Sequence, residues 1–70
     1  MTAQRTPGQG MPCEERRDLI AGTARAKGHV WVADLVRELG VSRMTIHRDL
    51  QRLAAQGRIR RIRSGAAAAA

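Results

Sequence analysis

The chain has 70 residues, of which 13 are lysine or arginine and 6 are aspartate or glutamate, so its formal net charge is +7. Seventy residues allow one small domain with a modest core, which leaves no room for an enclosed catalytic pocket beside a binding module. A single cysteine excludes an internal disulfide and a multi-cysteine metal site, and we expect neither a metal nor a cofactor. No apolar run approaches the roughly 20 residues that a membrane span requires.

The first 12 residues, MTAQRTPGQGMP, contain two prolines and two glycines and show no apolar periodicity, so they predict a disordered leader. A first helix is expected from about Cys13 to Lys27, because acidic residues in its early turns and basic residues in its last turn complement the helix dipole. Gly28 is expected to end this helix. The three- and four-residue spacing predicts an inward-facing stripe of Leu19, Ile20, Thr23 and Ala24.

The next segment, His29-Val30-Trp31-Val32, is β-prone and predicts a short strand. A second helix is expected to follow from roughly Val32 to Leu39. Its apolar residues recur at helical spacing. The residues expected to face inward are Leu35, Val36 and Leu39.

Residues 39–50, LGVSRMTIHRDL, predict the end of one helix, a tight turn and the start of another helix. Gly40 stands where a helix C-terminus favours a left-handed residue. The Ser42 hydroxyl is placed to accept a backbone N–H from the first turn of the next helix, which we expect from about Arg43 to Gln56. This arrangement predicts a helix-turn-helix, whose second helix can enter the DNA major groove.

On a helical wheel centred on the buried Ile46, the first two turns of this helix present polar and cationic side chains to solvent. The outward residues, with the one at the entrance, are Arg43, Met44, Thr45, His47 and Arg48. Arg48 can contact guanine through two parallel hydrogen bonds, and Thr45 or Met44 can meet a thymine methyl group. Ser42 and the helix N-terminus can bind a phosphate. The opposite, core-facing stripe is expected to be Ile46, Leu50 and Leu53.

The positive charge is concentrated in the C-terminal part of the chain. Residues 43–70 carry seven arginines against Asp49 alone, a net charge of +6, whereas residues 1–42 have a net charge of +1. The RIRRIR run at 58–63 predicts an exposed strand that leans on the helices. The arginines suited to phosphates or the minor groove are Arg52, Arg58, Arg60, Arg61 and Arg63. This distribution favours double-stranded DNA as the partner.

Residues 15–65 resemble the N-terminal winged helix-turn-helix domain of DeoR-family bacterial transcriptional regulators. The residues that carry the resemblance are Arg16, Leu19-Ile20, Gly28-His29-Val30, Val32, Asp34-Leu35, Leu39-Gly40-Val41-Ser42, Thr45-Ile46-His47-Arg48-Asp49-Leu50, Leu53, Gly57, Ile59 and Arg61. The family pattern usually reads VSxxTIRRDLxxLxxxGxIxR followed by His-Gly-Gly-Ala. The resemblance implies a mainly α fold with a small β wing, and sequence-specific operator binding with Ser42, Thr45 and Arg48 as contacts.

The sequence departs from the family pattern in two places. His47 replaces the usual arginine, which removes a fixed charge from the helix expected to enter the major groove, called the reading helix below. Ser64-Gly65-Ala66 replaces the usual Gly-Gly-Ala, and we expect the second wing strand to be absent. The wing would then be incomplete, with the domain spanning residues 13–65 and residues 66–70 forming a poly-alanine tail.

Family members continue into a domain that senses sugar phosphates and oligomerises, and we expect no such effector domain in this chain. Homodimerisation is left open. The expected function is sequence-specific binding of double-stranded DNA by a transcriptional regulator, a repressor acting by occlusion, in the cytoplasm at the nucleoid. Two alternatives stand beside it, namely a winged helix that docks on another protein and a non-functional remnant of a truncated regulator.

An enzyme is not expected, because the sequence offers no nucleophile–base pair and no metal constellation. Asp49 is the one acidic residue in the reading helix. It is expected to pair with a neighbouring arginine and to orient it.

Overall fold

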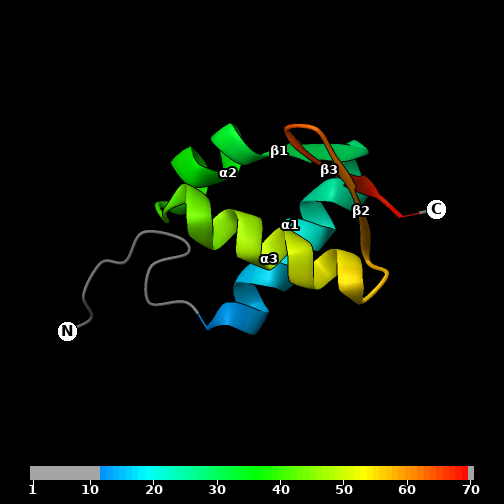
Figure 1. Cartoon of the computed structure of the whole chain (residues 1–70), viewed down its shortest axis with the longest axis horizontal. Helices are drawn as coiled ribbons and strands as arrows, with labels where there is room; N and C mark the ends of the chain where they lie inside the picture. Colours follow the sequence, from blue (N-terminus) through cyan, green and yellow to red (C-terminus); the bar gives the residue numbers. More distant parts are fainter. Residues whose placement is uncertain (1–11, 70) are drawn as a thin grey trace.

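The computed structural model describes residues 12–69 and contains three helices and three short strands (Figure 1). The elements are α1 (Cys13–Lys27), β1 (His29–Trp31), α2 (Val32–Leu39), α3 (Arg43–Ala55), β2 (Ile59–Ile62) and β3 (Gly65–Ala68). Three helices with a small antiparallel sheet confirm the predicted winged helix-turn-helix fold. The predicted leader, apart from Pro12, lies outside the described residues.

Left-handed glycines end α1 and α2, as the sequence predicts. Gly28 has a φ of 91°, and its N–H donates to the carbonyl oxygen of Ala24 at 2.7 Å. Gly40 has a φ of 68°, and its N–H donates to the carbonyl oxygen of Val36 at 3.0 Å. A side chain with a Cβ rarely adopts this backbone conformation, so the two glycines set where the chain leaves each helix.

The sheet has the order β1-β3-β2, with both neighbours antiparallel to β3. The prediction that the second wing strand is missing is therefore wrong, and the alanines 66–68 belong to the sheet instead of forming a tail. Alanine has low strand propensity, but β3 forms hydrogen bonds on both of its edges, and this pairing outweighs the local preference. Ala66, which is fully buried, lies opposite Val30 in β1 and Arg61 in β2.

The core lies between the three helices and one face of the sheet. Its buried apolar residues are Ile20, Ala21, Ala24, Val30, Val32, Leu35, Leu39, Ile46, Leu50, Leu53, Ile59 and Ala66. The stripe predicted for α3, namely Ile46, Leu50 and Leu53, is completely buried.

The inward stripe of α1 differs from the predicted one. Ala21 is buried, whereas Leu19 is 44% exposed and Thr23 is half-buried. Helical spacing places Leu19 and Ala21 on either side of Ile20, and the packing of α1 against α3 and the sheet selects the Ala21 side. Leu19 consequently lines a surface hollow between α1 and α2.

Candidate nucleic-acid interface

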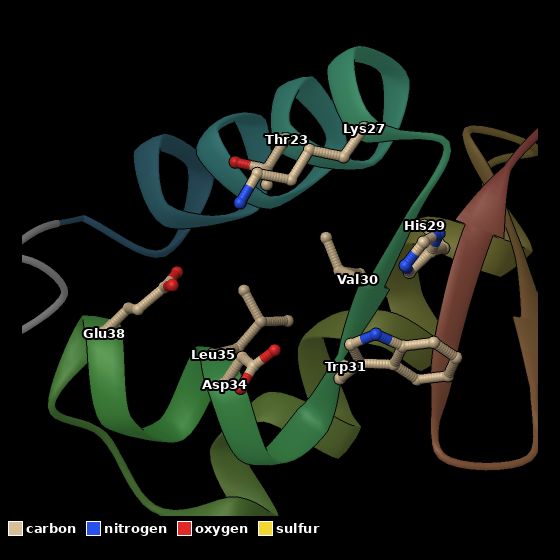
Figure 2. Close-up of a pocket in the computed structure, with 8 residues that line it drawn as sticks. All are labelled: Thr23, Lys27, His29, Val30, Trp31, Asp34, Leu35 and Glu38. Carbon is tan, nitrogen blue, oxygen red and sulfur yellow. The ribbon is translucent and has the colours of Figure 1, made fainter.

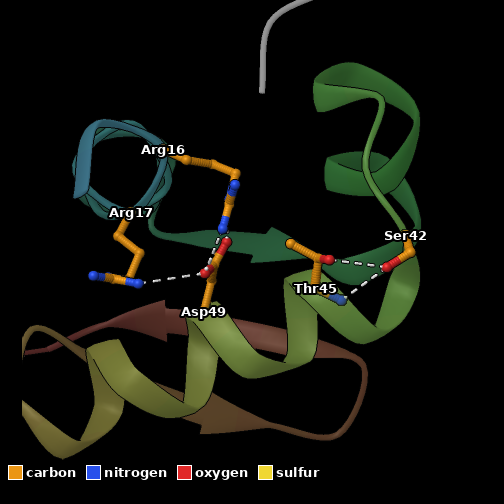
Figure 3. Close-up of polar contacts among 5 residues, drawn as sticks. All are labelled: Arg16, Arg17, Ser42, Thr45 and Asp49. Carbon is orange, nitrogen blue, oxygen red and sulfur yellow. Dashed lines mark hydrogen bonds and ion pairs between the residues drawn. The ribbon is translucent and has the colours of Figure 1, made fainter. Parts of the chain in front are cut away.

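The first turn of α3 is capped by the serine that the sequence singles out (Figure 3). The Ser42 Oγ accepts the backbone N–H of Thr45 at 3.1 Å and donates its own proton to Thr45 Oγ1 at 2.9 Å. The predicted cap is thus confirmed. Because the Ser42 proton is directed to Thr45, the Thr45 hydroxyl keeps its own proton for donation to a ligand oxygen.

The outward surface of α3 is the one that the helical wheel predicts. Arg43, Met44, His47 and Arg48 are all exposed, with Met44 at 70%, while Thr45 is half-buried beside the cap. An apolar side chain as exposed as Met44 at the start of a helix is available for contact with a partner. We call this set, Arg43, Met44, Thr45, His47 and Arg48, the reading surface.

A buried ion pair fixes α3 against α1 (Figure 3). The Arg16 guanidinium donates through Nε and Nη2 to the two carboxylate oxygens of Asp49, with 3.0 Å between Nη2 and Oδ1. The side chains are only 9% and 2% exposed, respectively. The hydrogen bonds to Asp49 raise the pKa of Arg16, outweighing the effect of its desolvation. Arg17 adds a weaker contact, with Nη1 3.7 Å from Oδ1.

Asp49 therefore pairs with arginines of α1 and not with those of α3 that flank it in the sequence. Sequence reasoning did not place Arg16 at the site, because the contact joins residues 33 positions apart. The signal available was the occurrence of Arg16 and Asp49 together in the residues that carry the family resemblance. Asp49 was expected to orient one neighbouring arginine side chain. The ion pair with Arg16 instead holds the whole of α3 against α1.

We call β2, β3 and the turn between them the wing. The wing contacts the reading surface through Arg61. Its Nη2 lies 3.3 Å from Nδ1 of His47, and its Nε donates to the carbonyl oxygen of Gly65 at 3.4 Å. Arg60, in the same strand, is exposed, as is Arg63 in the turn that follows β2. The structure thus brings the wing and the reading helix together at the His47–Arg61 contact.

A groove of about 410 Å³ lies between the start of α3, the start of α2 and the turn of the wing. The cationic side chains Arg43, from α3, and Arg63, from the turn after β2, both line it, together with His47 and Ser64. Positive charge along a groove attracts a polyanion. Three of the predicted contact residues, Arg43, His47 and Arg63, thus line one groove.

Two of the predicted arginines lie elsewhere. Arg52 and Arg58 line a separate depression with Arg17 and Asp18 of α1. The Nη2 of Arg58 is 2.9 Å from Oδ1 of Asp18, so part of its charge is compensated within the protein. The structure does not bring Arg52 and Arg58 to the groove beside the wing, and their contact with DNA stays a prediction.

Another hollow, of about 140 Å³, lies between α1, β1 and α2 (Figure 2). Thr23 and Lys27 face it from α1, whereas Asp34 and Glu38 line it from α2. Its charges are mixed, and no residue of α3 or of the wing lines it. It is therefore separate from the reading surface.

Within residues 12–69, no three histidine, cysteine, aspartate or glutamate side chains lie close enough together to hold a metal ion. None of the helices in this part of the chain is long and apolar enough to cross a membrane.

In this winged helix-turn-helix, α2 and α3 form the helix pair, and α3 presents a cationic, solvent-exposed surface. These features define a DNA-binding module. The family model of the DeoR-like helix-turn-helix domain matches residues 16–70, and the chain belongs to this family. The resemblance seen in the sequence is thereby confirmed. The family is one of DNA-binding domains of transcriptional regulators.

A curated relative is the uncharacterized HTH-type transcriptional regulator YgbI of Escherichia coli (strain K12). It is 47% identical over 45 residues, which are 64% of this chain and 18% of that protein. The match thus spans less than a fifth of the relative's length. No solved structure matches the chain.

Proposed function

We propose that the chain binds double-stranded DNA sequence-specifically through α3 and represses transcription by occupying an operator that overlaps a promoter. The observation that carries this proposal is the Ser42-capped start of α3, which presents exposed Arg43 and Arg48 beside an arginine-bearing wing. A helix of this kind fits the major groove, and its N-terminal residues reach the base edges.

The contacts divide by chemistry. Arg48 and Thr45 suit base edges, since a guanidinium can bind guanine through two hydrogen bonds and a threonine methyl can pack on a thymine methyl. Ser42 and Arg43, at the N-terminus of α3, suit a phosphate. The wing arginines Arg60 and Arg63 suit phosphates or the minor groove, where they would raise affinity for all sequences alike.

The remaining parts of the proposal follow from this DNA target. A regulator that occupies an operator acts without catalysis, in the cytoplasm at the nucleoid. Effector sensing and dimerisation are not proposed from these residues. If two copies bind together, their half-sites would be spaced by about one helical turn of DNA or a multiple of it.

One argument for the remnant alternative is that a missing wing strand would remove part of the core. Gly65–Ala68 supplies that strand as β3, so this argument no longer supports the remnant alternative.

The experiment is a selection of bound sites from random duplex DNA, repeated at low and at high salt. The proposal expects one enriched motif that persists at high salt, because base-edge contacts do not depend on counterion release as phosphate contacts do. The control is the double variant Arg43→Ala, Arg48→Ala, which should lose the motif. Two outcomes would contradict the proposal. One is binding that enriches no motif and is lost as the salt concentration rises. The other is an absence of DNA binding, in which case docking on another protein becomes the better explanation.

A further inference from the structure

His47 is the residue of the reading surface at which this chain departs from its family pattern, and it is also the residue that the wing contacts. We propose that Arg61 holds His47 in the neutral tautomer with the proton on Nε2, which makes His47 a hydrogen-bond donor to an acceptor on a base edge. The wing would then take part in sequence specificity. This inference rests on the proposed function, and it assigns to Arg61 a positioning role in place of a phosphate contact alone.

The chemistry of the two side chains determines the direction of their hydrogen bond. A guanidinium carries five N–H donors and no acceptor. The Nδ1 of His47, 3.3 Å from Nη2 of Arg61, can therefore take part only as an acceptor, without a proton. In a neutral imidazole the remaining proton is then on Nε2, so this nitrogen donates.

Arg61 also contacts the sheet. Its Nε donates to the carbonyl oxygen of Gly65 at 3.4 Å, so the guanidinium spans from the central strand of the sheet to α3. Gly65 is itself held by pairing with Trp31 in β1 and with Ile62 in β2. The tautomer of His47 is thus tied to the sheet through one side chain.

The groove that His47 lines carries two further cationic side chains. Arg43 and Arg63 line the same groove, and no acidic residue lines it.

A single N–H donor at this point reads a defined class of bases. Guanine presents O6 and N7 in the major groove, adenine presents N7 and thymine presents O4, whereas cytosine presents a donor. His47 would therefore reject a cytosine at the base that it faces. The arginine of the family pattern would instead favour guanine through two hydrogen bonds.

The first test needs no DNA, so its failure is distinguishable from a failure of the proposed function. In the ¹⁵N-labelled chain, the ring nitrogen shifts of His47 should show the Nε2–H tautomer. Arg61→Ala should alter these shifts, while His29, on β1, serves as the internal reference. Arg60→Ala removes the same charge from the same strand and should leave His47 unchanged.

A protonated Nδ1 in the wild type would overturn the proposal, and so would ring shifts of His47 that are the same in wild type and Arg61→Ala.

The second test is site selection with the same variants. Arg61→Ala should weaken the base preference at a single position of the motif, and His47→Ala should weaken it at the same position. The expected loss is roughly 2- to 12-fold in Kd, as for one neutral hydrogen bond. His47→Arg should shift that position to guanine and make it insensitive to Arg61→Ala. Arg60→Ala should lower affinity for all sites without changing the motif.

A uniform loss of affinity in Arg61→Ala with an unchanged motif would overturn the proposal and leave Arg61 as a phosphate contact. If neither the wild type nor any variant selects a motif, the proposed function fails. The NMR measurement still decides whether Arg61 sets the tautomer of His47.

Discussion

Arg16 of α1 and Asp49 of α3 form a buried ion pair in which two guanidinium nitrogens meet two carboxylate oxygens, across 33 positions of the sequence. Asp49 directly follows Arg48, which points to solvent. The pair therefore holds one side of α3 in the core and leaves the reading surface on the other side. The orientation of the reading surface thus depends on a buried contact between α3 and α1.

We expect Arg16→Ala to lower the free energy of unfolding by about 3–5 kcal/mol, because it leaves a buried carboxylate with only the weaker Arg17 contact. The measurement is urea denaturation. Arg37→Ala is the matched control, since it breaks an exposed pair with Asp34 of 2.7 Å and should cost no more than about 1 kcal/mol. Equally small losses in the two variants would show that the buried pair does not hold α3.

The cap at Ser42 allows stability and DNA binding to be separated. Ser42→Ala should lower the free energy of unfolding by about 0.5–2 kcal/mol, because the N–H of Thr45 loses its acceptor. Ser42→Asp should keep a cap and near wild-type stability, yet weaken DNA binding, because it places a negative charge where a phosphate is expected. Thermal unfolding and fluorescence anisotropy measure the two effects. Wild-type affinity in Ser42→Asp would move the start of α3 away from the DNA backbone.

The close contact at Gly65 predicts a large difference between two glycine substitutions. A Cβ at Gly65 would lie 1.9 Å from the carbonyl oxygen of Val30, so Gly65→Ala must push β3 away from β1 and should destabilise the fold by at least about 1–3 kcal/mol. At Gly22, in the exposed interior of α1, an added Cβ would meet no atom within 4 Å beyond its chain neighbours and the backbone of its own helix, so Gly22→Ala should stabilise the fold by about 0.5–1 kcal/mol. Both are measured by thermal unfolding. A neutral Gly65→Ala would contradict the pairing of β3 with β1.

For the reading surface, we expect Arg48→Ala to cost on the order of 1–3 kcal/mol of binding free energy at a selected site and to relax the preference there, because a bidentate base contact is lost. Arg25→Ala, on α1, removes an exposed arginine outside the reading surface and is the control. Anisotropy titrations with the selected site and a scrambled site give both quantities. Equal losses on the two sites would make Arg48 a phosphate contact.

For the wing, we expect Arg63→Ala to reduce the slope of log K against log salt by about 1, as for one lost phosphate contact. Arg58→Ala should change the slope less, because Asp18 already compensates part of that charge. Affinities measured over a series of salt concentrations test this pair. A larger change in Arg58→Ala would place DNA on the α1 side of the wing.

The sequence by itself determined the features that depend on local chemistry. Gly28 and Gly40 end α1 and α2 because each stands where only a residue without a Cβ readily turns left-handed. Ser42 caps α3 because its hydroxyl reaches an N–H three residues along the chain. The exposed face of α3 follows from the helical period alone.

Only the tertiary structure decided the features that join distant segments. Residues 65–68 become a central strand because β1 and β2 pair with both of its edges, against the low strand propensity of alanine. The partner of Asp49 and the contact of Arg61 with His47 likewise depend on how α1 and the wing pack on α3. Local propensity and periodicity carry no information on such non-local pairing, because its free energy exists only once the segments have come together.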